Sequence, residues 1–114
     1  MLIVEREVGD VAVFEPRDRV DATGREEFYR TLYGAMDRGF TKILVDMANV
    51  PYIDSAGVGV LFGIFTSLRK KEGTIRLANV GERLRKILTL VCLEDMIEIC
   101  DSVDQALEVF SQDK

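Results

Sequence analysis

The 114-residue sequence contains no histidine and no tryptophan, and it has only two cysteines and two prolines. Without histidine the Ser-His-Asp arrangement of serine hydrolases cannot form, and zinc sites lose a common ligand. Cys92 and Cys100 match neither a Cys-x-x-Cys motif nor zinc-site spacing, so we expect two reduced cysteines in the core. The sequence therefore predicts no metal site and no cofactor.

An excess of positive charge and a long hydrophobic segment are also missing. The 15 Lys and Arg residues are outnumbered by 20 Asp and Glu, which leaves a net charge of -5 and argues against binding to nucleic acid or anionic membranes. The longest uncharged stretch, residues 55–68, is shorter than the roughly 20 residues of a membrane-spanning helix. The N-terminus does not resemble a signal peptide, so we expect a cytoplasmic protein.

What remains is the composition of an ordinary globular protein, with 47% hydrophobic and 31% charged residues. Its length suits a single domain over residues 1–114. Near the N-terminus, residues 2–8 and 11–15 flank Gly9 and Asp10 as the two strands of a hairpin do. Pro16 should end the second strand because it lacks an N–H group.

Helical and strand-like patterns alternate after the hairpin. Thr23 and Glu26 fit a capping box at the start of a helix that should run to about Arg38. In chain order, the later predictions are a strand ending near Asp46, a helix from Ser55 to about Arg69, a strand over 73–79, a helix over 81–91, a strand over 96–100 and a helix capped by Ser102. These elements predict an α/β fold with a mixed sheet and about four helices.

The junction "YIDSAGVGVLFG", residues 52–63, places Ser55 between a strand-like segment and a helix. Serine is a preferred helix N-cap, which is the first interpretation. The second is a nucleophile elbow, Gly-x-Ser-x-Gly, but Ile53 replaces the first glycine and no histidine can accept the proton. The third is a phosphorylation site, because a helix N-terminus accommodates an anion.

The glycines of this helix do not match a nucleotide-binding motif. At about 100° per residue, one side of the helix should face the sheet with Leu61, Ile64, Phe65 and Leu68. The opposite side, near Ser55, should carry Gly59, Gly63, Thr66 and Lys70, with Phe62 at its border. Glycine on an outward face allows another backbone to come close, either that of a partner or that of a neighbouring loop in the same chain.

The segments "ILVDMANVPYIDSAGVGVLF" and "RLANVGERLRKILTLVCLEDMIEICDSVDQALEVF" resemble the STAS domain family, specifically the free-standing bacterial anti-sigma factor antagonists. The resemblance implies a mixed sheet flanked by helices, no catalytic activity, and partner switching. In such systems the unphosphorylated antagonist sequesters an anti-sigma factor that is also a serine kinase, which frees a sigma factor. The kinase phosphorylates the serine of the Asp-Ser-x-Gly motif, here Ser55, and a PP2C-type phosphatase restores it.

On this resemblance, we expect a partner-binding surface formed by Asp21, Asp54, Ser55, Gly59, Phe62, Gly63 and Thr66. Two departures from the family pattern stand out. The segment "PRDRVDA" lacks the glycine that the family often has before the first helix, and Cys92 stands where the family often has glycine. We expect the second change to be harmless to packing.

Two other functions are compatible with the sequence. STAS domains also occur as constitutive scaffold subunits of signalling or transporter complexes. The other is an enzyme or a nucleotide-binding protein: the resemblance permits nucleotide binding, although no residue pattern in this sequence supports it.

Overall fold

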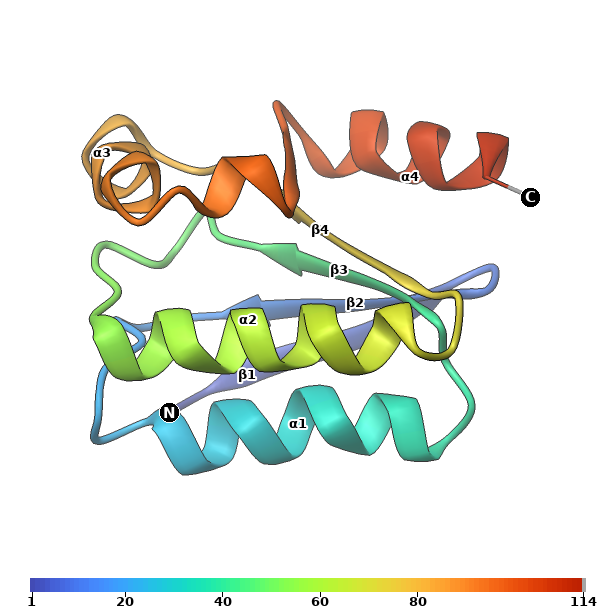
Figure 1. Cartoon of the computed structure of the whole chain (residues 1–114), viewed down its shortest axis with the longest axis horizontal. Coiled ribbons are helices and arrows are strands. Elements are labelled where there is room, and N and C mark those ends of the chain that lie inside the picture. Colours follow the sequence, from blue (N-terminus) through green and yellow to red (C-terminus); the bar gives the residue numbers. More distant parts are fainter. Residues whose placement is uncertain (114) are drawn as a thin grey trace.

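The computed structural model describes residues 1–113 and contains a five-stranded sheet with the order β1-β2-β3-β4-β5 (Figure 1). The strands are β1 (Ile3–Val8), β2 (Val11–Pro16), β3 (Lys42–Asp46), β4 (Thr74–Ala78) and β5 (Glu98–Cys100). β1 pairs with β2 in antiparallel orientation, and the remaining pairs are parallel. The predicted hairpin and the predicted mixed sheet are confirmed.

The helices are α1 (Arg25–Asp37), α2 (Ser55–Arg69), α3 (Glu82–Leu90) and α4 (Val103–Gln112), with a short 3₁₀ turn over Leu93–Asp95. α1 and α2 lie side by side along the sheet, with α3 next to the N-terminal half of α2 (Figure 1). Apolar residues of α1, α2 and α3 share one core with the sheet, whereas α4 packs in a second core on the other face. No helix within residues 1–113 is long and apolar enough to cross a membrane.

The alternation of side chains along β2 explains why both faces need cover. Ala12 and Phe14 belong to the core beneath α1 and α2, while Val11 and Val13 belong to the core beneath α4. A strand that is apolar on both faces is typical of a sheet covered by helices on both sides.

The parallel arrangement of β2, β3 and β4 brings the loops that follow these strands to one edge of the sheet. The loop after β2 and the loop after β3 are joined there by a parallel bridge between Val20 and Ile53. The predicted site residues Asp21 and Asp54 each follow one partner of this bridge, so the fold brings together two segments that are far apart in the sequence.

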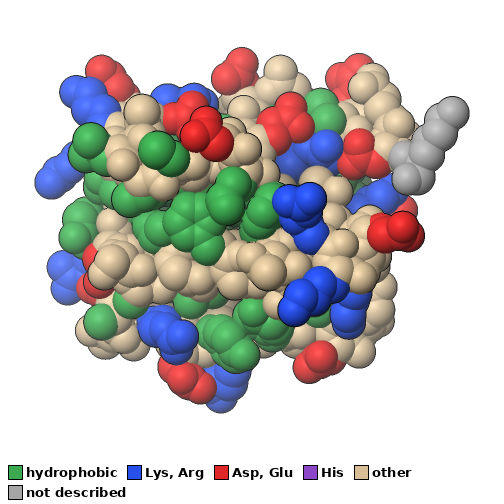
Figure 2. Space-filling model, in the orientation of Figure 1, with side chains coloured by type: hydrophobic (Ala, Val, Ile, Leu, Met, Phe, Trp, Pro, Cys, Tyr) green, Lys and Arg blue, Asp and Glu red, His purple; other side chains and the backbone are tan. Residues whose placement is uncertain are grey.

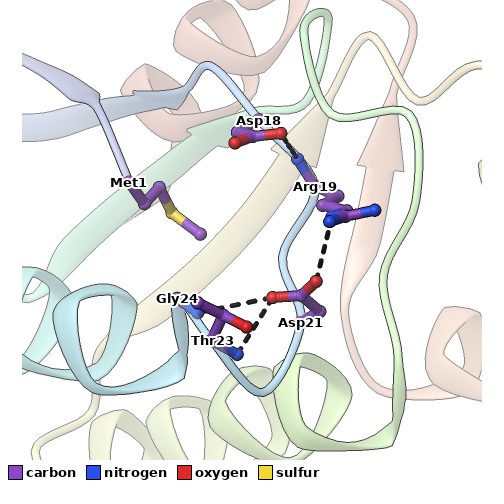
Figure 3. A pocket seen from close by; sticks show the side chains of 6 residues that line it. All are labelled: Met1, Asp18, Arg19, Asp21, Thr23 and Gly24. Atoms are coloured by element: carbon purple, nitrogen blue, oxygen red, sulfur yellow. Dashed lines mark hydrogen bonds and ion pairs between the residues drawn. The ribbon is translucent and has the colours of Figure 1, made fainter.

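The predicted capping box at the start of α1 is wrong. The N-cap of α1 is Gly24, without a side-chain capping hydrogen bond. The Asp21 carboxylate instead accepts hydrogen bonds from the backbone N–H groups of Thr23 (3.0 Å) and Gly24 (3.4 Å) and pairs with Arg19 at 3.0 Å (Figure 3). Because α1 begins at Arg25, its N-cap position falls on Gly24, and Thr23 lies in the preceding turn that Asp21 forms.

Both cysteines are free, but only one has the predicted environment. Cys100 is buried, as expected, whereas Cys92 is exposed. Cys92 follows α3 with a φ of 57°, in the left-handed region. That conformation favours glycine, which gives a physical reason for glycine to be preferred at this position.

Candidate functional site

Ser55 is the first residue of α2, but it does not cap the helix. The N-cap is Asp54, whose extended backbone precedes the helix and whose Oδ1 accepts a hydrogen bond of 3.1 Å from the Gly57 N–H. The predicted N-cap role of Ser55 is therefore wrong, because Asp54 reaches the first-turn donor from one residue earlier. Ser55 is exposed, and none of the hydrogen bonds formed within residues 1–113 uses its hydroxyl.

The carboxylate of Asp54 also binds the segment before α1. Its Oδ2 accepts a hydrogen bond of 3.1 Å from the Ala22 N–H. In the backbone, the Asp54 N–H donates to the Val20 carbonyl at 3.1 Å, and the Val20 N–H donates to the Tyr52 carbonyl at 2.9 Å. Asp54 thus fixes the position of Ser55 relative to the loop that contains Asp21.

Gly57, which the sequence analysis did not place among the partner-binding residues, is needed for this arrangement. A Cβ atom added there would lie 2.6 Å from Ile53 Cγ1 and 2.7 Å from the Val20 carbonyl oxygen. Only glycine allows the Val20 segment to come this close to the first turn of α2. The glycine of the Asp-Ser-x-Gly motif therefore has a packing role, and the motif itself was the signal for it.

The two outward glycines of α2 differ in their surroundings. An added Cβ at Gly59 would have no neighbour within 4 Å, so this face of the helix is open. At Gly63 the added Cβ would lie 3.2 Å from the Tyr33 hydroxyl, which in turn forms a hydrogen bond of 3.1 Å with Ser67. Gly63 is thus covered by a helix of the same chain, α1, and only Gly59 remains accessible to another backbone.

The other two predicted residues of α2 lie on the same exposed side. Thr66 is exposed, and its hydroxyl donates a hydrogen bond of 3.0 Å to the Phe62 carbonyl. Phe62 is half-buried and packs against the core. Its ring therefore lies at the boundary between the core and the surface near Gly59, as the helical spacing predicted.

A groove of about 420 Å³ adjoins Ser55 between α2 and α3. We call it the α2–α3 groove; its lining includes Tyr52, Ser55, Val58, Phe62, Ile87 and Val91. Hydrophobic side chains gather over this gap between the two helices (Figure 2). The sequence analysis predicted a helix over residues 81–91 but did not bring its Ile87 and Val91 near Ser55, because no local pattern shows how α3 packs against α2.

The site combines an exposed hydroxyl, a helix N-terminus and an apolar groove. The first-turn N–H groups of α2 favour negative charge, and α2 itself carries no acidic side chain. Within residues 1–113, no group of three or more His, Cys, Asp or Glu side chains is placed to hold a metal ion. The arrangement suits the binding of a macromolecular partner and the acceptance of a phosphoryl group.

Comparison with known proteins identifies a family and several relatives. The family model described as "STAS domain" matches residues 3–106. A candidate anti-sigma factor antagonist of Thermotoga neapolitana is 28% identical over 102 residues, which cover 89% of this chain and 90% of that protein.

Solved structures share the fold. The crystal structure of a candidate anti-sigma factor antagonist from Thermotoga maritima superposes with a TM-score of 0.92 at 23% identity, over 96% of this chain and 95% of the other. The cell fate determinant SpoIIAA of Bacillus, in its phosphorylated form, superposes with a TM-score of 0.75 at 20% identity, over 96% of this chain and 99% of the other.

Proposed function

The chain belongs to the STAS domain family, and we propose that within this family it acts as an anti-sigma factor antagonist switched by phosphorylation of Ser55. In its unphosphorylated form it sequesters an anti-sigma factor with serine kinase activity and so frees a sigma factor. Phosphorylation by that kinase releases the complex, and a PP2C-type phosphatase restores the binding form. The antagonist names of its sequence relatives support the first part of this proposal.

The observation that carries the proposal is that the neighbouring residues Asp54 and Ser55 have different roles. Asp54 caps α2 and holds the neighbouring loop, whereas the Ser55 hydroxyl is exposed and has no structural task within residues 1–113. A kinase can therefore modify Ser55 without removing the cap of the helix.

A phosphoryl group at Ser55 would change the surface strongly and the fold little. It adds about -1.5 to -2 charges at neutral pH. The N-terminus of α2 tolerates this charge because its backbone N–H groups point toward it. Since Ser55 lines the α2–α3 groove, the added charge would stand inside the surface that a partner covers.

The partner-binding surface that we propose contains the predicted residues Asp21, Asp54, Ser55, Gly59, Phe62, Gly63 and Thr66. Their roles within it differ. Gly59 and Thr66 are accessible for direct contact. The carboxylates of Asp21 and Asp54 instead fix the adjoining loop by accepting hydrogen bonds from its backbone N–H groups. Gly63 contributes by leaving room for Tyr33 of α1 beside α2.

The test is an affinity capture from the source cell with Ser55→Ala and Ser55→Asp baits, followed by mass spectrometry. We expect the Ala bait to retain a serine kinase of the anti-sigma type and the Asp bait to lose it. Incubation of the purified kinase with the wild-type chain and ATP should then phosphorylate Ser55. The same set of proteins on both baits would reject the switch.

Both baits must be folded for the comparison to count. Because Asp54 provides the cap, each substitution should change the free energy of unfolding by no more than about 0.5 kcal/mol, as is usual for surface positions. Urea denaturation of the two variants checks this before the capture.

A further inference from the structure

Strand β1 forms one edge of the sheet, because β2 is its only partner strand within residues 1–113. It contains six residues and no proline, and Val4, Glu5, Arg6 and Glu7 are exposed. The strand at the opposite edge, β5, is only three residues long. A long, exposed edge strand offers its free backbone groups to a further strand, so β1 is the edge that is open to pairing.

The backbone groups that β1 directs outward follow from its hydrogen bonds to β2. In an antiparallel pair, alternate residues direct both their N–H and their C=O groups toward the partner strand. The Leu2 carbonyl accepts a hydrogen bond of 2.9 Å from the Arg17 N–H, so the even-numbered residues of β1 bond to β2. Ile3, Glu5 and Glu7 therefore direct their N–H and C=O groups away from β2, toward the open edge.

The same edge carries exposed apolar side chains. Leu2 is 65% exposed and Val4 is 38% exposed. Both alternate in phase with Val8, which packs against the core beneath α4. Helix α4 contacts β3, β4 and β5, and it leaves the first residues of β1 uncovered on this face. A second strand beside β1 would cover Leu2 and Val4.

On the other face of the sheet, one side of α1 borders β1. Glu27 pairs with the amino group of Met1 at 3.1 Å, and Arg38 pairs with Glu5 at 3.8 Å. At about 100° per residue, Gly34 lies on the same side of α1 as Glu27 and Arg38. Glycine inside a helix is destabilising relative to alanine, yet a Cβ added at Gly34 would meet only the Arg38 guanidinium, at 3.7 Å, among residues 1–113. Packing within the chain thus does not require this glycine.

We propose that β1 pairs in antiparallel orientation with β1 of a second copy of this chain, around a two-fold axis at Val4. Residues that face each other share one face of the sheet, so the axis passes through a residue and places it opposite its own copy. An axis at Glu5 or at Arg6 would place like charges directly opposite each other, which is destabilising. An axis at Val4 places Val4 opposite Val4, and Leu2 opposite the aliphatic stem of Arg6.

An axis at Val4 also suits the backbone. It places Ile3 of each copy opposite Glu5 of the other, and both residues direct their backbone groups outward, so each such pair exchanges two hydrogen bonds. An axis at Ile3 would pair no residue beyond Glu5. On the face that α1 covers, the two α1 helices come to lie beside each other across the axis, where Gly34 lets them approach. The edge is thus complementary to itself, which favours a second copy over an unrelated strand.

This pairing leaves the proposed switch accessible. Ser55 follows β3, and β2 lies between β3 and β1. The dimer therefore keeps both copies of Ser55 and of the α2–α3 groove free for a partner. Dimerisation goes beyond the proposed function and does not depend on it.

Sedimentation velocity of the full chain tests the dimer. An interface built on one strand pair buries less than the roughly 1,200 Å² of a standard interface, so we expect a dissociation constant between about 1 μM and 1 mM. Val4→Lys places two cations at the axis and should raise this constant by about tenfold or more. The matched control is Val91→Lys, which alters a valine of similar exposure (41%) just after α3 and should dimerise like wild type.

Two further variants probe the backbone and the helix contact. Glu5→Pro removes an outward N–H group without removing a hydrogen bond to β2, and it should abolish the dimer. Gly34→Leu adds a side chain where the two α1 helices approach and should weaken the dimer, whereas the monomer has room for its Cβ. Thermal unfolding of each variant shows that the monomer is folded before its association is measured.

Disulfide cross-linking measures the register. In a chain with the exposed Cys92 replaced by serine, Val4→Cys places two thiols in a non-hydrogen-bonded pair whose Cα atoms lie about 4.5 Å apart, which is within disulfide range. Air oxidation should therefore link the two copies. Arg6→Cys in the same background is the control, because an axis at Val4 keeps its two thiols about 13 Å apart along the strands.

A chain that remains monomeric up to about 1 mM would overturn the inference. A dimer of unchanged strength in Val4→Lys would also overturn it, because the interface would then lie elsewhere. Cross-linking of Arg6→Cys as efficient as that of Val4→Cys would reject the axis. None of these measurements involves the kinase, so their outcome is separate from that of the capture experiment.

Discussion

The Asp54 carboxylate accepts a hydrogen bond of 3.1 Å from the backbone N–H of Ala22, 32 residues earlier in the chain. Its second oxygen caps α2 through Gly57. One side chain therefore orients both the helix that begins at Ser55 and the loop before α1, and the geometry of the site depends on it.

Replacing Asp54 should destabilise the fold, and the loss should depend on how many of its two hydrogen bonds the new side chain can keep. Asp54→Ala removes both hydrogen bonds and should lower the free energy of unfolding by about 1–2 kcal/mol, the upper range for an N-cap. Asp54→Asn keeps a single side-chain carbonyl oxygen, so it can satisfy one of the two donors and should cost less. Urea denaturation measures both. If Asp54→Asn lowers the stability as much as Asp54→Ala does, the hydrogen bond that asparagine can keep contributes nothing.

Two glycines in the same helix should respond oppositely to alanine. Gly57→Ala places a Cβ against Ile53 and the Val20 carbonyl oxygen, and overpacking of this kind costs about 1–3 kcal/mol. Gly59→Ala meets no neighbour and should stabilise the helix by up to about 1 kcal/mol. Thermal unfolding of the two variants gives the comparison. If both substitutions destabilise equally, the close approach at Gly57 is not the reason for its glycine.

Arg76 should be the most important ion-pairing residue of the fold. It is buried, and it bonds to Glu98 at 2.8 Å and to Asp113 at 2.7 Å, with its guanidinium 4.5 Å from the centre of the Phe110 ring. Burial disfavours its charge, but the hydrogen bonds to Asp113 and Glu98 outweigh burial and raise its pKa, so it stays charged.

Arg76→Leu should therefore lower the free energy of unfolding by about 2 kcal/mol and loosen α4, whose last turn adjoins Asp113. The matched control is Arg85→Leu, which breaks only the exposed pair with Glu94 and should cost no more than about 0.5 kcal/mol. Hydrogen exchange of the α4 amides identifies the loosened element. Protection in α4 that is unchanged by Arg76→Leu would contradict the role assigned to this cluster.

The two thiols should differ in reactivity and in their effect on pH stability. Cys92 is exposed and should react with a thiol reagent in the native protein, whereas the buried Cys100 should react only after unfolding. Burial, reinforced by the charge of Glu98, raises the pKa of Cys100 above its ordinary value of 9.0. The unfolded thiol loses its proton first as the pH rises past about 9, so the free energy of unfolding should begin to fall there.

Other groups of the chain can also contribute at alkaline pH, so the effect of Cys100 is measured as a difference between two variants. Urea denaturation between pH 8 and pH 10 should give a steeper decline for wild type than for Cys100→Ala, which lacks the titrating group. Parallel declines would mean that the native and unfolded thiols have the same pKa. Two thiols that react at one rate in the native protein would contradict the burial of Cys100.

The course of the chain could be predicted from local patterns. Each of these patterns repeats with the period of the strand or helix that contains it. They are the alternation around Gly9, the buried face of α2, and the apolar stripe of α1 with Phe28, Leu32, Ala35 and Met36. The family resemblance could be seen for the same reason, because it rests on two contiguous segments, one around Ser55 and one that runs from Arg76 in β4 to Phe110.

The errors all concern hydrogen-bond partners or packing that a local pattern leaves open. Thr23 and Ser55 are both good N-cap residues, yet Asp54 takes the first-turn donor of α2, and Thr23 lies in a turn formed by Asp21 before the N-cap of α1. Cysteine is a residue type that is often buried, but Cys92 lies exposed just after α3. Competition between neighbouring polar groups decides caps, and it depends on backbone angles that the sequence does not display.

By itself, the sequence determined the order of strands and helices, the acidic charge, and the position of a serine at the start of α2. Only the tertiary structure decided that Ala22 would bind Asp54, that Tyr33 would cover Gly63 while Gly59 stayed open, and that Ile87 and Val91 would adjoin Ser55. The physical reason is the distance along the chain over which each effect acts. Periodicity relates residues within a turn or a few residues of a strand, whereas these contacts form only after separate elements pack onto a common sheet.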